Sequence, residues 1–508
     1  MIRHEAHFGD RVVRCFAERP HSFFELFMDA VKRNPDGEAL VSANERFTWG
    51  SLAERVARVA QGLSSRNIRH GDRVALLLGN RPEFVLTVFA AARLGAIAVP
   101  LSIRSSKPEL AYVLGDCGAS LVIHETELSD RLPESPSRIA VDDFRALLER
   151  PHGEAARVGE EDTAAILYTS GTTGHPKGAM LSHLGIVHSA MHYERGMTLT
   201  EADRSIAAVP LSHVTGLIAL IATMARCAGT LILLPAFKAA DFLALAARER
   251  MTHTVLVPAM YNLCLLEPSL EGLDLTRWRI GGYGGAPMPL PTIARFAEML
   301  PRLGLMNLYG ATETTSPATM MPPHETARHA ASVGLVVPCG EIRVVDDELW
   351  IKGPMVVRGY WNDAPATARE FTDGFWQSGD IGAVDAEGFV YVYDRKKDMI
   401  NRGGYKVYSA EVESALLEHP GVVEAAVVAV PCPVLGERVH GFITLRKPGT
   451  VSVTALQAFC GERLADYKVP ESFTFRTEPL PRNANGKVLK RALRDELSSG
   501  SAQPPTPR

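Results

Sequence analysis

An apolar run, Ala164-Ala-Ile-Leu-Tyr168, leads directly into the segment Thr169-Ser-Gly-Thr-Thr-Gly-His-Pro-Lys-Gly178. The run predicts a buried strand and the segment predicts a loop after it. Glycines let backbone N–H groups converge on an anion, the hydroxyls can donate to phosphate oxygens, and Lys177 adds a positive charge. A plain solvent-exposed loop is the alternative interpretation. The segment is not a GxxxxGK[ST] loop, because Gly178 follows the lysine. It therefore predicts a phosphate-binding loop of another kind.

Strand-like and helix-like segments alternate on both sides of this loop. We expect strands at 72–78, 96–101, 120–124, 163–168, 204–209, 230–234 and 254–258, and helices at 51–66, 81–94, 106–117, 214–227 and 238–250. Ser51 and Glu54 predict a capping box at the start of the helix at 51–66. Strands that alternate with helices favour parallel-type βαβ sheets covered on both faces, so the predicted fold class is α/β.

The pattern changes twice towards the C-terminus. Short strands punctuated by Gly and Asp predict a β-rich subdomain at about 335–394. Beyond it, a helix at 409–419, strands at 423–430 and 439–446 and a helix at 452–465 predict a small α+β domain. We therefore expect a large N-terminal domain at 1–394, a C-terminal domain at 399–495 and a disordered tail at 496–508.

Composition excludes several classes of protein. The 508 residues are 46% hydrophobic and 22% charged, which is typical of a globular protein with more than one core. The formal net charge of −4 gives no basic excess, so no nucleic-acid partner is expected. Seven cysteines without CxxC spacing indicate reduced thiols. Arg93 and Arg226 interrupt the two longest apolar stretches, so no transmembrane segment is expected. We predict a cytoplasmic protein that is a monomer or homodimer.

Further motifs follow the loop in a fixed order. They are Gly284–Pro287, Asn307-Leu-Tyr-Gly-Ala-Thr-Glu313, Glu348–Pro354 with Gly359-Tyr360, Ser378-Gly-Asp380, Asp394–Asp398, Gly403-Gly-Tyr405 and Pro481-Arg-Asn-Ala-Asn-Gly-Lys487. Together with the loop, they resemble the signature motifs of the adenylate-forming superfamily. That superfamily contains acyl- and aryl-CoA synthetases, peptide-synthetase adenylation domains and beetle luciferases. The resemblance spans roughly residues 40–495.

This resemblance implies roles for individual residues. The residues that would bind ATP or AMP are Thr169, Ser170, Gly171, Thr172, Thr173, Gly174, Gly285, Ala286, Pro287, Tyr309, Gly310, Asp380 and Arg395. The residues that would act in catalysis are Lys487, Glu313, Thr312, Lys177 and His213. Glu313, with Thr169 as a second contact, would hold the Mg²⁺ that accompanies ATP, since hard carboxylate oxygens suit this ion. Without the resemblance, the alternative interpretation is that Glu313 and Asp380 are ordinary turn residues and that Lys487 is a solvated lysine.

The family also performs a second half-reaction. Its small C-terminal domain rotates about a hinge, which corresponds here to residues 395–398 with Lys397 at the hinge position. The resemblance then places Gly403 and Gly404 beside the pantetheine arm of CoA, the second co-substrate. CoA is the expected acceptor because no insertion interrupts 355–395 and no carrier domain is expected after Lys487. Carrier-protein acylation and luciferase-like oxidation are less favoured alternatives. A non-catalytic binding protein is a further alternative, but Lys177, Glu313 and Lys487 are all present.

The expected acyl pocket indicates the class of acid. Its candidate residues are His213, Val214, Met260, Tyr283 and Gly284. The segments 212–218, 258–262, 282–285 and 307–315 contain no Arg or Lys, which disfavours dicarboxylates such as malonate. The stretch 204–240 contains no Asp to pair with an amino acid's ammonium. A hydrophobic monocarboxylate remains: a medium- or long-chain fatty acid is favoured, and an aryl or alicyclic acid is the alternative.

Overall fold

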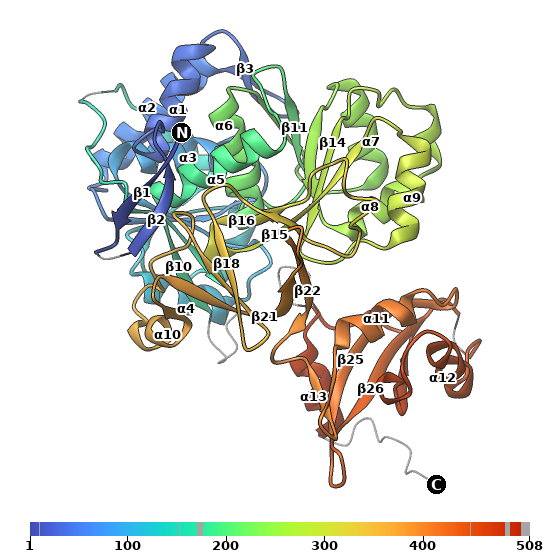
Figure 1. Cartoon of the computed structure of the whole chain (residues 1–508). Coiled ribbons are helices and arrows are strands. Elements are labelled where there is room, and N and C mark those ends of the chain that lie inside the picture. Colours follow the sequence, from blue (N-terminus) through green and yellow to red (C-terminus); the bar gives the residue numbers. More distant parts are fainter. Residues whose placement is uncertain (10, 152, 170–175, 448, 483–487, 499–508) are drawn as a thin grey trace. The chain divides into compact units, whose positions relative to one another are not determined.

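The computed structural model describes residues 1–508 except 10, 152, 170–175, 448, 483–487 and 499–508 (Figure 1). The chain forms two compact units. The large unit comprises residues 1–343, 350–377 and 384–390, and the small unit comprises 344–349, 378–383 and 391–508. Both units mix helices and strands, so the α/β fold class is confirmed. Among the described residues, no helix combines the length and the apolar character that a membrane span requires.

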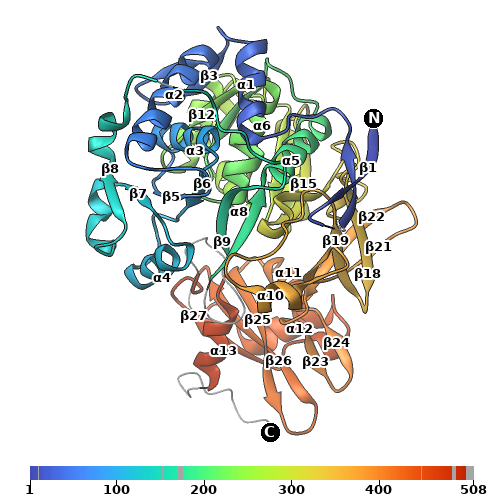
Figure 2. The same cartoon turned by 90° about the vertical axis from the view of Figure 1, so that its left-hand side faces the viewer.

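The first sheet of the large unit has the strand order β10-β9-β6-β5-β7-β8. Its strands are β5 (Arg73–Leu77), β6 (Ile97–Pro100), β7 (Leu121–His124), β8 (Ser137–Ala140), β9 (Thr163–Thr169) and β10 (Lys177–Ser182). All neighbouring pairs are parallel except β9 and β10, which run antiparallel on either side of the predicted phosphate loop. Helices α2 (Trp49–Ser65) and α3 (Pro82–Leu94) pack on each other (Figure 2). The predicted strand–helix alternation is confirmed here.

The second sheet of the large unit has a parallel centre. Parallel pairing joins β15, β14, β13, β11, β12 and β3 in that order. The strands are β3 (Glu38–Val41), β4 (Arg46–Thr48), β11 (Arg204–Ala207), β12 (Thr230–Leu233), β13 (His253–Leu256), β14 (Ile280–Gly284), β15 (Gly304–Ala311), β16 (Ser316–Met320) and β17 (Gly334–Val336). The strands β18 (Glu341–Val345), β19 (Glu348–Lys352), β20 (Phe371–Thr372), β21 (Phe375–Val384) and β22 (Phe389–Arg395) supply the β-rich pattern that the sequence predicts there.

Helix α3 of the large unit buries a nearly continuous apolar face that includes Phe84, Val88 and Phe89. The remaining helices are α1 (Phe23–Arg33), α4 (Lys107–Cys117), α5 (His183–Gly196), α6 (Thr223–Cys227), α7 (Ala239–Arg248), α8 (Pro258–Leu265), α9 (Leu290–Met299) and α10 (Ala364–Glu370). Short 3-10 helices are η1 (Thr126–Arg131), η2 (Val141–Leu147), η4 (Pro268–Gly272) and η5 (Thr312–Thr314).

Two local predictions need correction. The capping box at α2 joins Thr48 and Ser51, not Ser51 and Glu54, because the helix begins two residues earlier than predicted, at Trp49. The single helix predicted at 214–227 consists of the π-helix η3 (Thr215–Ala222) followed by α6. At its start, the backbone oxygen of Pro210 would lie 2.3 Å from a Cβ on Gly216, so the helix packs directly on the preceding loop.

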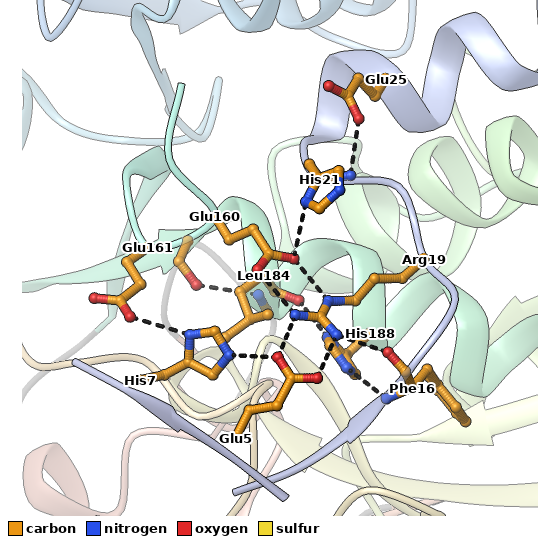
Figure 3. A network of polar contacts seen from close by, with 12 residues as sticks. Glu5, His7, Phe16, Arg19, His21, Glu25, Glu160, Glu161, Leu184 and His188 are labelled. Atoms are coloured by element: carbon orange, nitrogen blue, oxygen red, sulfur yellow. Dashed lines mark hydrogen bonds and ion pairs between the residues drawn. The ribbon is translucent and has the colours of Figure 1, made fainter. Parts of the chain in front are cut away.

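The N-terminal hairpin of β1 (Ile2–His7) and β2 (Arg11–Phe16) is attached to the large unit by an ion-pair network (Figure 3). Arg19 lies at its centre: Nη2 lies 2.7 Å from Oε2 of Glu5, and Nε lies 2.7 Å from Oε1 of Glu160. His7 contacts Glu161 at 3.0 Å. The network ties the first strand to residues far along the chain.

The small unit contains a sheet of order β24-β23-β26-β25, with β27 paired to β26. Its elements are β23 (Ile400–Arg402), β24 (Tyr405–Val407), α11 (Ser409–Leu417), β25 (Val422–Cys432), β26 (Gly436–Leu445), α12 (Val453–Gly461), η6 (Asp466–Lys468), β27 (Ser472–Arg476) and α13 (Lys490–Ser498). Val412, Val427, Leu456 and Phe473 belong to its core. Residues 496–498 of the predicted tail are helical, and 499–508 lie outside the described residues.

Candidate active site

Four parallel strands of the second sheet bring the predicted residues to one edge. The carboxyl ends of β11, β13, β14 and β15 point the same way, because neighbouring strands among them pair in parallel. His213 and Val214 follow β11, Met260 follows β13, and the loop from Gly284 follows β14. Ligands of open α/β sheets bind in the crevice outside the carboxyl ends of the strands. The predicted acyl and adenine residues of the large unit therefore share one edge.

Glu313 lies at this edge in the short helix η5, directly after β15. Its side chain is buried, and its Oε1 is 3.4 Å from Thr169 Oγ1 and 3.1 Å from the hydroxyl of Tyr360. Its backbone oxygen accepts a 2.9 Å hydrogen bond from the N–H of Val357. These contacts bring the end of β9, the start of η5 and the segment before α10 together around one carboxylate.

The chemistry of Glu313 fits the Mg²⁺ that ATP requires. Its Oε2 makes no hydrogen bond with any residue that the structure describes, so one carboxylate oxygen remains available as a ligand. Mg²⁺ is usually held by one or two carboxylates together with substrate phosphates. Thr169, the second predicted contact, is half-buried and faces the same carboxylate. Glu313 with Thr169 is thus a suitable donor set for this ion.

Lys177 lies at the start of β10, where the register pairs it with Thr169. Its ammonium group is buried and lies 2.7 Å from both carboxylate oxygens of Glu370. The same Nζ lies 4.3 Å from the centre of the Tyr360 ring, within the range of a cation–π contact. The predicted phosphate-binding lysine is therefore fixed by a carboxylate and an aromatic ring.

Sequence reasoning missed Glu370, and it gave Tyr360 no role. The hydroxyl of Tyr360 lies 2.7 Å from Glu370 Oε2 as well as 3.1 Å from Glu313. Burial and the two carboxylates raise the pKa of Tyr360, so the phenol stays protonated. Burial pushes the pKa of Glu370 up, but the hydrogen bonds from Lys177 and Tyr360 outweigh it and the net direction is down. No local pattern in the sequence marks Glu370, because its partner Lys177 lies 193 positions away.

The predicted adenine-side loop and the YGATE segment are both shaped by glycine. Gly285 has φ +78°, in the left-handed region, and Ala286 and Pro287 beyond it are exposed. At Gly310, a Cβ would lie 1.6 Å from the backbone oxygen of Ser316, so only glycine fits. Tyr309 and Thr312 on either side of this turn are half-buried. Thr312 directly precedes Glu313 in η5.

The predicted acyl residues differ in exposure. His213, Val214, Met260 and Gly284 are half-buried, whereas Tyr283 is buried in β14, where burial raises its pKa to about 12. Its neighbour Gly282 accepts a 2.9 Å hydrogen bond from the hydroxyl of Tyr261, which stacks on Trp278. Tyr261 and Trp278 thus pack as an aromatic pair against β14.

The small unit contains the remaining described candidates. Asp380 is buried and its Oδ1 lies 2.7 Å from Nε of Arg395, so the two predicted ribose contacts pair with each other. Lys397 is exposed, and its backbone oxygen lies 3.4 Å from Nη2 of Arg494. Gly403 and Gly404 have φ +60° and +92°, a conformation that glycine adopts without strain.

Several predicted residues lie outside the described part of the chain. They are Ser170, Gly171, Thr172, Thr173, Gly174 and Lys487. Their assignment therefore depends on the sequence motifs alone.

Comparison with known proteins identifies two family models in this chain. Residues 27–361 match the AMP-binding enzyme family, and residues 411–487 match the AMP-binding enzyme C-terminal domain. A feruloyl-CoA synthase of Amycolatopsis sp is 35% identical over 484 residues, covering 91% of this chain and 96% of that protein. The long-chain-fatty-acid–CoA ligase FadD13 of Mycobacterium tuberculosis is 34% identical over 480 residues, covering 90% and 94%.

Solved structures agree with these matches. The o-succinylbenzoate CoA synthetase MenE of Bacillus subtilis, in complex with its acyl-adenylate intermediate, superposes with a TM-score of 0.85 at 32% identity, covering 94% of this chain and 99% of that one. The same enzyme has been solved with ATP and a magnesium ion, at a TM-score of 0.84 and 32% identity, covering 93% of this chain and 99% of that one. The chain belongs to the AMP-binding enzyme family, within the adenylate-forming acyl-CoA synthetases, and is an acid–thiol ligase.

Proposed function

We propose that this ligase joins a hydrophobic monocarboxylic acid to CoA in two steps. In the first, an oxygen of the substrate carboxylate attacks the α-phosphorus of ATP, and the bond to pyrophosphate breaks. In the second, the thiolate of CoA attacks the acyl carbonyl, and AMP leaves. The observation that carries the proposal is the buried cluster of Lys177, Glu313, Tyr360 and Glu370 beside the carboxyl ends of β14 and β15.

The first step is limited by charge. The carboxylate is already a nucleophile, so it needs no general base, but it must approach a triphosphate with about four negative charges. Lys177 would meet the phosphates with a fixed positive charge, and the motif assigns Lys487 to the α-phosphate and the attacking carboxylate. Bound through Glu313 and Thr169, Mg²⁺ would neutralise phosphate charge. A single contact of this kind contributes up to about 4 kcal/mol at ~4 Å in an effective dielectric of ~20.

The ribose and the second step involve the small unit. We propose that Asp380 accepts hydrogen bonds from the ribose hydroxyls and that Arg395 donates to the same sugar. Their 2.7 Å ion pair supports this, because it orients both side chains. We also propose that rotation at 395–398, with Lys397 as the hinge, exchanges the Lys487 loop for Gly403 and Gly404 between the half-reactions. The domain limits proposed from the sequence are 1–394 and 399–495.

A medium- or long-chain fatty acid is the first candidate for the acid. The segments proposed to line the acyl pocket carry no Arg or Lys, so a second carboxylate would be desolvated without a partner. An aryl monocarboxylic acid is the second candidate, because relatives are named for feruloyl- and indoleacetate-CoA ligation.

A substrate panel tests this proposal. The full-length protein is incubated with ATP, Mg²⁺, CoA and one acid at a time: straight chains of increasing length, hydroxycinnamic, indoleacetic and benzoic acids, malonic acid and an amino acid. The proposal predicts acid-dependent release of AMP and the matching acyl-CoA by mass spectrometry for a hydrophobic monocarboxylate. Turnover confined to malonic acid or to the amino acid would overturn the pocket assignment. A response to none of the acids would overturn the proposal itself.

A further inference from the structure

Glu370 stands out among the glutamates of the large unit because it pairs with the phosphate-loop lysine. Its two carboxylate oxygens lie 2.7 Å from Lys177 Nζ, and one of them also lies 2.7 Å from the hydroxyl of Tyr360. Arg369 adds a weaker, exposed contact at 3.0 Å. Lys177 has 9% of its side chain exposed and Glu370 has 22%. This ion pair is thus largely shielded from solvent, unlike most surface pairs.

The backbone around Glu370 fixes its position. The strand β10 and the segment before α10 are joined by hydrogen bonds from Trp361 N–H to the Gly178 oxygen at 2.7 Å and from Met180 N–H to the Gly359 oxygen at 3.2 Å. Asp363 caps α10 by accepting a 3.0 Å hydrogen bond from the N–H of Ala366. Glu370 ends this helix. A helix anchored to the strand that begins with Lys177 therefore presents the carboxylate to the ammonium.

We infer that Glu370 is a positioning residue for Lys177 in the adenylation step. An ammonium group has three N–H donors. The two short contacts to Glu370 engage part of this donor set and orient the group, so that a remaining N–H is available to a phosphate oxygen of ATP. This inference rests on the proposed adenylation function.

The charges of the cluster allow two possible roles of Glu370 to be distinguished: positioning Lys177, or competing with phosphate for it. Glu370 and Glu313 both face Tyr360, so the cluster holds two carboxylates and one ammonium before any nucleotide binds. If Glu370 only competed with phosphate for Lys177, its removal would tighten ATP binding and speed the reaction. If it positions Lys177, its removal leaves a buried cation unpaired and free to rotate, and slows the reaction.

Two substitutions separate charge from shape. Glu370→Gln keeps the size but removes the charge and replaces one acceptor oxygen with an amide NH2, whereas Glu370→Asp keeps the charge on a shorter side chain. The matched control is Glu194→Gln. Glu194 lies on α5, its side chain is 18% exposed, and it forms a 2.8 Å ion pair with Arg226. Acid-dependent exchange of pyrophosphate into ATP is measured for each variant at several ATP and acid concentrations, and thermal unfolding reports folding.

We expect Glu370→Gln to lower kcat of the exchange ~30-fold, as the loss of a hydrogen bond to a charged group would, with KM for the acid within about twofold. The expected order is wild type, then Asp, then Gln, because charge matters more than shape. A Gln variant as active as Glu194→Gln, or more active than Asp, would overturn the inference. So would a lower KM for ATP with a higher kcat. Wild-type protein without any exchange would instead overturn the proposed function.

Discussion

The two carboxylate oxygens of Glu313 differ in their contacts, and this difference leads to a direct prediction. Oε1 contacts Thr169 and Tyr360, whereas Oε2 makes no hydrogen bond within the described residues. Glu313→Gln should lower adenylation ~100-fold or more, because a preorganised charge at the phosphates is lost. The half-saturating Mg²⁺ concentration should also rise. Pyrophosphate exchange measured over a Mg²⁺ titration checks both effects, and unchanged Mg²⁺ dependence would contradict the ligand role.

His188 is a second residue with a clear expectation. Its Nε2 accepts a hydrogen bond from the N–H of Phe16 at 3.2 Å, so Nδ1 donates to the Leu184 oxygen at 2.9 Å and the ring is neutral (Figure 3). Burial lowers its pKa to about 4. In the unfolded chain the pKa is about 6.5, so the unfolded state takes up the proton first. The resulting stability is present above about pH 6.5 and is lost as the pH falls towards 4.

The His188→Gln variant isolates this effect. Between pH 7 and pH 4.5, the wild type should lose about 2 kcal/mol more unfolding free energy than the variant. Urea unfolding of both proteins at the two pH values measures the difference. Equal losses would show that His188 does not titrate as its burial requires.

The residues that the sequence revealed and those it missed differ in a physical way. Glu313 and Lys177 stand in local runs of glycine and hydroxyl residues whose composition already suggests anion chemistry. Glu370 lies 193 positions from its partner Lys177, in a helix with no unusual composition. Only the pairing of the segment before α10 with β10 brings the two together, and no local pattern contains that information.

At the scale of elements, the N-terminal hairpin of β1 and β2 depends on Arg19. The Arg19 side chain is 4% exposed and pairs with Glu5 and Glu160. Arg19→Met should lower the unfolding free energy by about 3 kcal/mol, because removing one partner leaves buried charges uncompensated. The control Arg66→Met removes a 3.5 Å pair with Glu149 whose partners are 35% and 39% exposed, and it should cost less than about 1 kcal/mol. Similar losses for both variants in chemical denaturation would refute the network's role.

The same hairpin contains a group of metal-type ligands that is better explained without a metal. Potential donor atoms of Glu5, His7 and Cys15 lie within 4.8 Å of one another. However, the guanidinium of Arg19 already pairs with Glu5, and a cation beside it would be repelled. Burial raises the pKa of the Cys15 thiol to about 12, so this potential ligand is protonated. The cluster is therefore an ion-pair network that attaches β1.

Element types were predictable, but some of their ends were not. Apolar runs and period-3.6 patterns located the strands β5, β6, β7, β9, β11, β12 and β13 and the helices α2, α3, α4 and α7, because local burial dictates them. They gave no helix at α1, α5, α8 or α9. The start of α2 was misplaced since Thr48 and Ser51 satisfy each other's backbone N–H groups, and a Ser–Glu pair only imitates that pattern. The π-helix η3 begins where Gly216 packs on the backbone of Pro210, and a pattern of apolar residues does not distinguish a π-helix from an α-helix.

Across the whole molecule, we expect that substitutions can separate the two half-reactions. Lys397→Pro fixes φ and removes a backbone donor at the proposed hinge, so it should slow thioester formation more than adenylation. Lys487→Ala should do the reverse: it should abolish adenylation but still convert supplied acyl-adenylate and CoA to acyl-CoA. Both variants are assayed by pyrophosphate exchange and by conversion of synthetic acyl-adenylate. Equal losses in both assays would argue against rotation about 395–398.

Formation of an acyl-adenylate can be tested by a single isotope experiment. The acid identified by the substrate panel is labelled with ¹⁸O in both carboxylate positions and turned over once with ATP, Mg²⁺ and CoA, and the AMP is analysed by mass spectrometry. Attack of the carboxylate on the α-phosphorus predicts that each AMP carries one ¹⁸O atom and each acyl-CoA retains one. AMP without label, or formation of ADP in its place, would contradict the adenylate mechanism.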